Sequence, residues 1–175
     1  MNLLETLRET ATKNADRLAL VDRNRRLTYR ELEGELANAA GFWRKRGLDS
    51  GDVVLFVHPV TIELYVALLS VLRIGAVAMF VDPSAKREVI QSAVDRLKPR
   101  AFFGSPKAHL LRVLHRGIRQ IPIQVMTHEL GQGEAVAEIF ESKPDDPALI
   151  TFTSGSTGQP KAVVRAHEFL LAQYE

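Results

Sequence analysis

The apolar positions of the chain follow two patterns, a helical period and short runs that are apolar on both faces. The helical period predicts helices over residues 2–14, 28–46, 61–74, 84–97 and 106–115. The apolar runs predict strands at residues 18–22, 53–57, 76–81, 101–103 and 121–125. Because these helices and strands alternate, the sequence predicts an α/β fold, with a mostly parallel sheet and helices on both faces.

Residues that favour helix caps stand at several of the predicted boundaries. Thr28 and Glu31 have the spacing of a capping box, and Gly47 is placed to end the same helix. Thr61 and Ser84 each precede a helical pattern, so we expect both to cap N-termini.

The helical and strand periods are lost between residues 127 and 147, where glycine and proline accumulate. We expect a polar connection there, with a short helix at residues 135–140. Regular structure then resumes, with a predicted strand at residues 149–152, a loop at 153–161, a strand at 162–165 and a helix from His167.

Composition bounds the kinds of protein that this can be. The 175 residues are 46% hydrophobic, enough for a substantial core, and the net charge is only +2, which gives no reason to expect a nucleic-acid partner. Basic clusters at residues 23–26 and 112–119 contain too few aromatic residues for base stacking and are interpreted as solvated surface. The absence of cysteine excludes disulfides and thiolate sites and fits a cytoplasmic protein.

Neither a signal peptide nor a transmembrane segment is expected. Residues 1–16 are charged throughout, and the longest apolar region, residues 62–81, is interrupted by Glu63, Arg73 and Gly75.

The strongest chemical signal is the loop TSGSTGQPK, residues 153–161. Its glycines allow backbone N–H groups to converge on an anion, its hydroxyls add donors, and its lysine brings a mobile positive charge to outer phosphates. The candidate ATP phosphate-binding residues are Thr153, Ser154, Gly155, Ser156, Thr157, Gly158 and Lys161.

The spacing of residues in this loop does not match two other well-known motifs, the Walker loop and the nucleophile elbow. Gly158 and Lys161 are separated by two residues, which excludes a Walker loop, and a GxSxG nucleophile elbow fails because Ser154 stands two residues before Ser156. A flexible linker is the alternative, although a proline, a lysine and flanking strand patterns argue against it.

TSGSTGQPK resembles the phosphate-loop signature of the AMP-forming adenylating enzymes, which include acyl-CoA synthetases, firefly-type luciferases and peptide-synthetase adenylation domains. The one departure is Ala162, where the family commonly has glycine. The stretches LTYRELEGELANAAGFWRKRGLDSGDVV and ELYVALLSVLRIGAVAMFVDPS are similar to the family's early elements in the same order. The region from Val81 to Arg112 looks most like bacterial fatty-acyl ligases and related enzymes of olefin biosynthesis.

The resemblance implies that a small-molecule carboxylic acid, a fatty acid in this interpretation, attacks the α-phosphate of ATP to give an acyl adenylate and pyrophosphate. Magnesium would share the phosphate charge, and coenzyme A would be the acceptor of the acyl group. An aryl or amino acid substrate stays open. In the family the catalytic lysine lies in a C-terminal domain, so Lys161 is not expected to be that residue.

Residues 1–175 would then be the N-terminal portion of the large adenylation domain, because the last helical pattern stops without a cap at Glu175. We expect such a piece to be inactive alone and to expose surface through which it could form a homodimer. A naturally truncated, non-catalytic module that binds nucleotide or a partner is the alternative.

Other polar residues give weaker signals. The five histidines show no i, i+4 pair, so no metal site is predicted. His167 stands where relatives often have histidine after the loop, so it could shape the site or simply cap a helix. Asp145 and Asp146 adjoin prolines and are interpreted as the end of a surface connection.

Overall fold

The computed structural model describes residues 3–82, 84–131, 133–153 and 161–173. Its first half contains α1 (Leu3–Lys13), β1 (Leu18–Val21), β2 (Arg26–Thr28), α2 (Tyr29–Lys45), β3 (Val53–Val57), α3 (Ile62–Arg73) and β4 (Val77–Phe80). The second half contains α4 (Arg87–Leu97), β5 (Ala101–Gly104), α5 (Pro106–Leu114), α6 (Arg116–Arg119), β6 (Ile123–Met126), the 3₁₀ turn η1 (Thr127–Glu129), β7 (Pro147–Thr153), β8 (Lys161–Ala166) and α7 (His167–Ala172).

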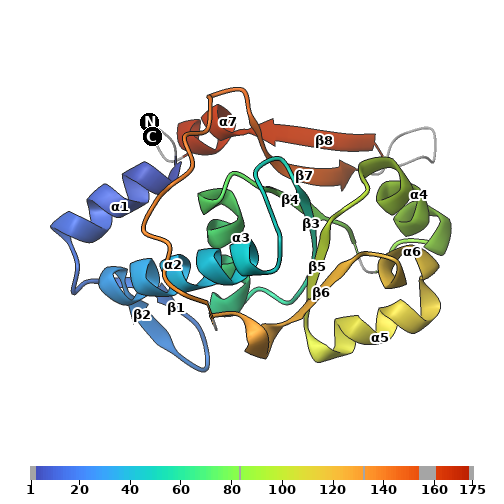
Figure 1. Cartoon of the computed structure of the whole chain (residues 1–175), viewed down its shortest axis with the longest axis horizontal. Helices are drawn as coiled ribbons and strands as arrows, with labels where there is room; N and C mark the ends of the chain where they lie inside the picture. The colour runs from blue at the N-terminus through green and yellow to red at the C-terminus, as the bar shows by residue number, and fades with distance from the viewer. Residues whose placement is uncertain (1–2, 83, 132, 154–160, 174–175) are drawn as a thin grey trace.

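A six-stranded sheet forms the centre of the molecule, with strand order β6-β5-β3-β4-β7-β8 (Figure 1). Neighbouring strands from β6 to β7 are parallel, and β8 returns antiparallel to β7. The short runs that form β3, β4 and β5 are buried almost throughout, as expected for strands covered on both faces. The predicted α/β class and mostly parallel sheet are confirmed.

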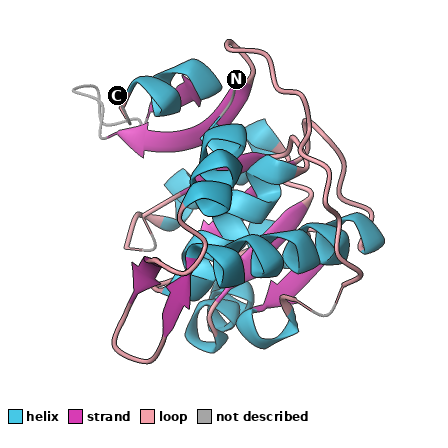
Figure 2. Ribbon diagram, turned by 90° about the vertical axis from the view of Figure 1, so that its left-hand side faces the viewer, coloured by secondary structure: helices cyan, strands magenta, loops and turns pink. Residues whose placement is uncertain are grey.

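Helices cover the two faces of this sheet separately (Figures 1 and 2). Alternate side chains of the strands, such as Phe56 and Phe103, pack against α2 and α3 on one face. Their neighbours Leu55 and Phe102 pack on the other face against α4, α5 and α6. A third apolar cluster joins α1 and the β1–β2 hairpin to α2 and α3.

Residues 133–143 cross the outside of α2 without forming a helix, so the predicted helix at 135–140 is wrong. The buried Arg73 guanidinium donates to the Val136 and Ala137 carbonyl oxygens at 3.1 and 2.7 Å and pairs with Glu33 at 2.8 Å. A Cβ at Gly41 would overlap the Glu134 carbonyl, which shows how closely the segment lies on α2. These carbonyls bind Arg73 from α3 and are therefore taken by a tertiary partner instead of an intrahelical one.

Of the predicted helix caps, the one at Thr28 is confirmed and the one at Thr61 is wrong. The Thr28–Glu31 capping box is confirmed, with the Glu31 N–H donating to Thr28 Oγ1 at 3.3 Å and the Thr28 N–H to Glu31 Oε2 at 2.8 Å. Thr61 makes no capping bond; Asp22, from the β1–β2 hairpin, accepts from the Ile62 N–H at 3.0 Å instead.

Other local predictions also need correction. Ser84 donates to the Asp82 carboxylate, and α4 begins only at Arg87. Residues 26–28, where the sequence pattern predicts no strand, form β2, which pairs antiparallel with β1. Gly47 follows α2 with a φ of 80°, the left-handed conformation expected of a C-terminal glycine.

Candidate functional site

The β7–β8 hairpin sets the two ends of the predicted phosphate loop. β7 pairs in parallel with β4, so its carboxyl end lies at the same edge of the sheet as those of β3, β4 and β5. Thr153 at the end of β7 is opposite Lys161 at the start of β8. The loop therefore begins and ends at the carboxyl edge, where parallel α/β sheets hold ligands.

Lys161 is exposed and forms no ion pair among the described residues. Ser154, Gly155, Ser156, Thr157 and Gly158 lie outside the described residues. The structure thus brings together Thr153 and Lys161, the two ends of the predicted set.

The direction in which the chain moves across the sheet reverses around β3. The chain passes from β3 to β4 on one side, then crosses back over β3 to reach β5 on the other. Helices after β3 and β5 consequently leave toward opposite faces, which opens a crevice at the carboxyl ends of these strands. A hollow of about 420 Å³ opens there, lined by Phe56, Val57, His58, Pro59, Phe80, Val81, Ser105, Lys107 and Ala108.

The walls of this hollow are mostly apolar, with a few oriented polar groups. His58 Nδ1 is 2.8 Å from the Pro59 carbonyl oxygen, and its Nε2 is 2.8 Å from Thr127 Oγ1. Because a carbonyl oxygen can only accept, Nδ1 carries a hydrogen and donates it to Pro59, while Nε2 and the Thr127 hydroxyl form the second hydrogen bond. The His58 ring also stacks on Phe103 at 5.3 Å between centroids, so the ring is held from three sides.

Sequence reasoning did not single out His58. Its position directly after a buried strand was the available signal, because the residue that follows such a strand lies at the carboxyl edge. Ser105 and Lys107 follow β5 in the same way and border the same hollow.

His167 lies at the opposite edge of the sheet from the loop. β8 runs antiparallel from Lys161 to Ala166, and His167 follows it. At about 3.4 Å per residue the strand separates His167 from the loop by roughly 20 Å. The structure therefore does not bring His167 together with Thr153 and Lys161, and gives no support to a site-shaping role.

The local surroundings of His167 are those of a buried anchor for α7. The residue is 3% exposed, and its backbone N–H donates to the Asp146 carbonyl oxygen at 3.1 Å. Desolvation lowers the pKa of His167, and the charge of Asp146 opposes that shift. Its Nδ1 has no hydrogen-bond partner among the described residues.

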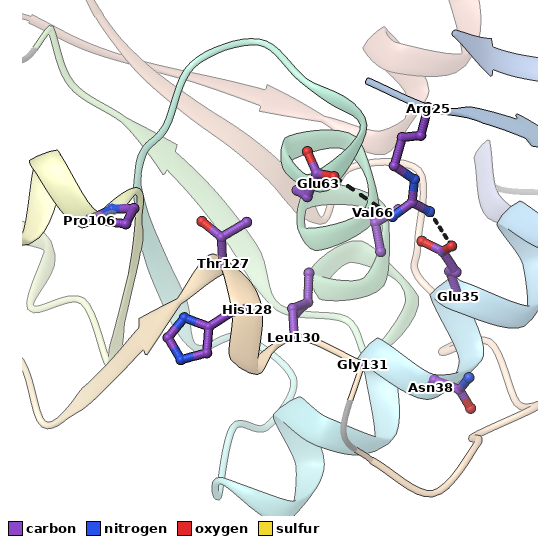
Figure 3. A pocket seen from close by; sticks show the side chains of 10 residues that line it. All are labelled: Arg25, Glu35, Asn38, Glu63, Val66, Pro106, Thr127, His128, Leu130 and Gly131. Carbon is purple, nitrogen blue, oxygen red and sulfur yellow. Dashed lines mark hydrogen bonds and ion pairs between the residues drawn. The ribbon is translucent and has the colours of Figure 1, made fainter. Parts of the chain in front are cut away.

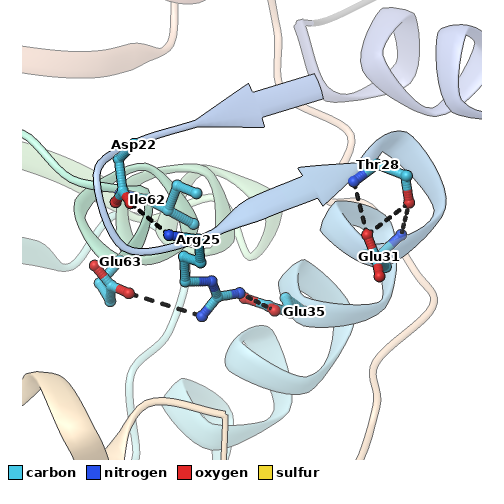
Figure 4. A network of polar contacts seen from close by, with 7 residues as sticks. All are labelled: Asp22, Arg25, Thr28, Glu31, Glu35, Ile62 and Glu63. Carbon is cyan, nitrogen blue, oxygen red and sulfur yellow. Dashed lines mark hydrogen bonds and ion pairs between the residues drawn. The ribbon is translucent and has the colours of Figure 1, made fainter. Parts of the chain in front are cut away.

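A second hollow, of about 540 Å³, lies between α2, α3 and the end of β6 (Figure 3). Its most conspicuous charged group, Arg25, pairs with Glu35 and lies 3.7 Å from Glu63. Figure 4 shows how these pairs and the Asp22–Ile62 bond attach the β1–β2 hairpin to α2 and α3. We therefore assign Arg25 a structural role.

Carboxylates in this hairpin network are held in the ionised form. Hydrogen bonds from the backbone N–H groups of Ile62, Asn24 and Arg25 lower the pKa of Asp22. Bonds from the Thr28 N–H and hydroxyl lower the pKa of Glu31. Both shifts follow from hydrogen bonding to the charged form.

In the part of the chain that the structure describes, no group of three or more histidine, aspartate or glutamate side chains could hold a metal ion. No described helix is long and apolar enough to cross a membrane.

Fold and site together define a parallel α/β domain with a ligand crevice and a hydroxyl-rich loop at the carboxyl edge of its sheet. The family described as AMP-binding enzyme matches residues 7–175, and the chain belongs to this family. The resemblance seen in the loop sequence is thereby confirmed.

Similar proteins carry several different activities in their names. The chain is 31% identical over 97% of its length to tyrocidine synthase 3 of Brevibacillus parabrevis, of which it covers 2%. It is 31% identical over 89% of its length to a 3-hydroxybenzoate/4-hydroxybenzoate CoA ligase of Thauera aromatica, covering 32% of that enzyme. An olefin β-lactone synthetase of Stenotrophomonas maltophilia is 29% identical over 99% of the chain, which covers 36% of it. The chain thus spans about a third or less of these relatives.

Solved structures agree on the fold. The NpsA N-terminal subdomain of Klebsiella oxytoca, in complex with 3-hydroxybenzoyl-AMSN, is 28% identical, with a TM-score of 0.79 over 95% of this chain and 41% of that one. The N-terminal domain of FACL13 from Mycobacterium tuberculosis has a TM-score of 0.85 at 22% identity over 95% of this chain and 44% of that one, a likeness of fold.

Proposed function

We propose that the chain is the phosphate-binding N-terminal portion of the large domain of an enzyme that activates a carboxylic acid with ATP. Family membership across residues 7–175 is the observation that carries this proposal. The loop at the carboxyl edge supplies the chemistry, because backbone N–H groups, hydroxyls and an exposed lysine suit a polyphosphate.

In the proposed reaction a carboxylate oxygen attacks the α-phosphorus of ATP. The bond from that phosphorus to the α,β-bridging oxygen breaks, so pyrophosphate leaves and an acyl adenylate forms. Thr153, Ser154, Gly155, Ser156, Thr157, Gly158 and Lys161 are proposed to hold the β- and γ-phosphates. Their role is to orient the leaving group and offset its charge as it departs.

Magnesium is proposed to arrive with the phosphates of ATP, as it commonly does, and no described residue is assigned to it. Coenzyme A is proposed as the acceptor that converts the adenylate to a thioester. A cytoplasmic location is also proposed, on the basis of a chain without cysteine. The expected homodimer has no support among the described residues or the similar proteins.

A fatty acid is the proposed substrate. The 420 Å³ hollow at the carboxyl edge of the sheet is lined mainly by apolar side chains, including Phe56, Phe80 and Val81, and an olefin β-lactone synthetase is among the relatives. Aryl and amino acids are the competitors that the other relatives suggest.

Carboxylate-dependent exchange of pyrophosphate into ATP tests the proposal in a longer natural protein that contains this chain. Fatty, aryl and amino acids would be compared at equal concentration. We expect exchange to depend on a fatty acid and to fall in a Lys161→Ala variant. Exchange supported only by aryl or amino acids would contradict the substrate, and no exchange with any acid would contradict the function. The 175 residues alone are expected to turn over negligibly.

A further inference from the structure

Helix α5 presents three large apolar side chains to solvent. Leu110, Val113 and Leu114 are 67, 79 and 62% exposed, and their spacing of three and four residues places them on one face. Figure 1 shows α5 at the outside of the molecule, away from α1 and α2. None of the three residues lines either of the hollows described above.

The described buried residues of α5 include a histidine. Ala108 and His109 face inward, and His109 Nε2 donates to the Val125 carbonyl oxygen at 3.0 Å while the ring packs on Phe102 at 5.0 Å. An ordinary surface helix turns its apolar stripe to the core and its histidine to water. Leu110, Val113, Leu114 and His109 of α5 depart from this rule, and such a break of the local rule is expected where a surface has a function.

The apolar face lies within the most basic part of the chain. Residues 96–128 contain seven of the 23 lysines and arginines and none of the 21 aspartates and glutamates. The rest of the chain, with 16 basic and 21 acidic residues, is acidic. The seven basic residues are Arg96, Lys98, Arg100, Lys107, Arg112, Arg116 and Arg119.

These basic groups are available for an outside partner. None of the seven forms an ion pair in the described part of the chain, and all except Arg112 are exposed. The neighbouring helix α4 carries two acidic residues, Glu88 and Asp95, and Asp95 accepts a hydrogen bond from Gln91 at 2.8 Å. The field over α5 and α6 is therefore positive.

We infer that α5, with α6 beside it, docks the protein on an anionic lipid surface. Exposed leucine and valine flanked by arginine and lysine are the features of a helix that lies in the membrane interface. A lipid surface also needs no matching hollow, which suits three side chains that project from an outer helix. Pro106 and Lys107 begin α5, and Lys107 also borders the 420 Å³ hollow, so docking would bring that hollow close to the lipid.

Sedimentation of the 175-residue chain with lipid vesicles tests this inference. We expect binding to vesicles of phosphatidylcholine mixed with phosphatidylglycerol, weaker binding at high salt, and little binding to pure phosphatidylcholine. Replacing Leu110, Val113 and Leu114 by glutamine should weaken binding by roughly tenfold or more per residue. Replacing Arg116 and Arg119 by glutamine should weaken it by roughly fivefold per residue.

The β1–β2 hairpin provides a matched control. Leu18 and Val21 are 54 and 56% exposed, and Arg23 and Arg26 are exposed beside them. Glutamine at these four positions makes the same chemical changes elsewhere and should leave vesicle binding unchanged. Equal losses in the two sets of variants would overturn the inference.

Other occupants of this face give different results. Concentration-dependent dimers in light scattering that the α5 glutamine variant abolishes would overturn the inference in favour of a second copy. Binding to duplex DNA that needs Arg116 and Arg119 but not Leu110 would overturn it in favour of nucleic acid. Absence of binding to any vesicle would also refute it.

Discussion

Helices α2 and α5 are both amphipathic in sequence, but they differ in how their described apolar side chains face the core. α2 buries its apolar stripe, with Leu36 and Trp43 fully enclosed and the Trp43 indole N–H donating to Ser70 Oγ at 3.0 Å. α5 buries His109 and exposes Leu110 and Val113. An apolar period therefore predicts that a helix exists, but not which side of it faces the core.

The two helices are therefore expected to contribute differently to stability. The contacts of α2 contribute to the core, whereas the exposed side chains of α5 have few neighbours to lose. Helix α7 resembles α5 in this respect, since its one buried residue is His167 and Phe169 is 43% exposed.

Truncation of Trp43 should give the largest loss of stability. Trp43→Ala removes a large buried side chain and leaves Ser70 without its donor, so the free energy of unfolding should fall by about 3–5 kcal/mol. Urea denaturation measures this loss. Val113→Ala on α5 is the paired change and should alter the value by less than about 0.5 kcal/mol. Comparable losses would remove the contrast between the two helices.

The N-terminal cap of α2 should contribute a smaller amount. Thr28→Ala removes the hydroxyl that accepts from the Glu31 N–H and should lower the free energy of unfolding by about 1 kcal/mol. Thr12, exposed within α1, bonds the Arg8 carbonyl and caps nothing, so Thr12→Ala should have almost no effect. Equal effects at the two threonines would show that the cap adds nothing.

The buried histidine of α7 should make stability depend on pH. Burial lowers the pKa of His167, so the unfolded chain binds its proton more readily than the folded chain. Stability from this group is present above about pH 6.5, the unfolded value, and is lost as the pH falls toward the lower folded value. Denaturation at several pH values should show that slope in the wild type and a weaker one in His167→Gln. Identical slopes would contradict the assignment.

Substitution of the α5 stripe should have the smallest effect on stability. Leu110, Val113 and Leu114 replaced by glutamine should each change the free energy of unfolding by less than about 0.5 kcal/mol, because these side chains are already in water. Thermal unfolding without lipid measures this. A large loss would mean that the stripe packs against something in this chain.

The sequence predicted those features that depend on residues close together in the chain. The buried runs of β3, β4 and β5 and the Thr28–Glu31 box follow from neighbours in sequence. The Asp22 cap of α3 and the hold of Arg73 on residues 136–137 could not be predicted, because each joins residues about 40 or more positions apart.

The candidate site likewise contains one part that the local sequence predicted and another that it did not. The loop was recognised from its glycine, hydroxyl and lysine spacing alone. The positions of His58 at the carboxyl edge and of His167 at the opposite edge depend on strand order and on the antiparallel return of β8, which no local pattern encodes. The positions of residues 154–158 stay a prediction.

The proposed binding of phosphates by the loop at residues 153–161 is tested most directly by a calorimetric titration of the chain with pyrophosphate and with ATP. The account predicts weak saturable binding of both, weakened about tenfold by Lys161→Ala through the loss of a charged contact. Lys45→Ala, at an exposed lysine of α2, should leave binding unchanged. Equal weakening by both variants, or no saturable binding of either ligand, would contradict it.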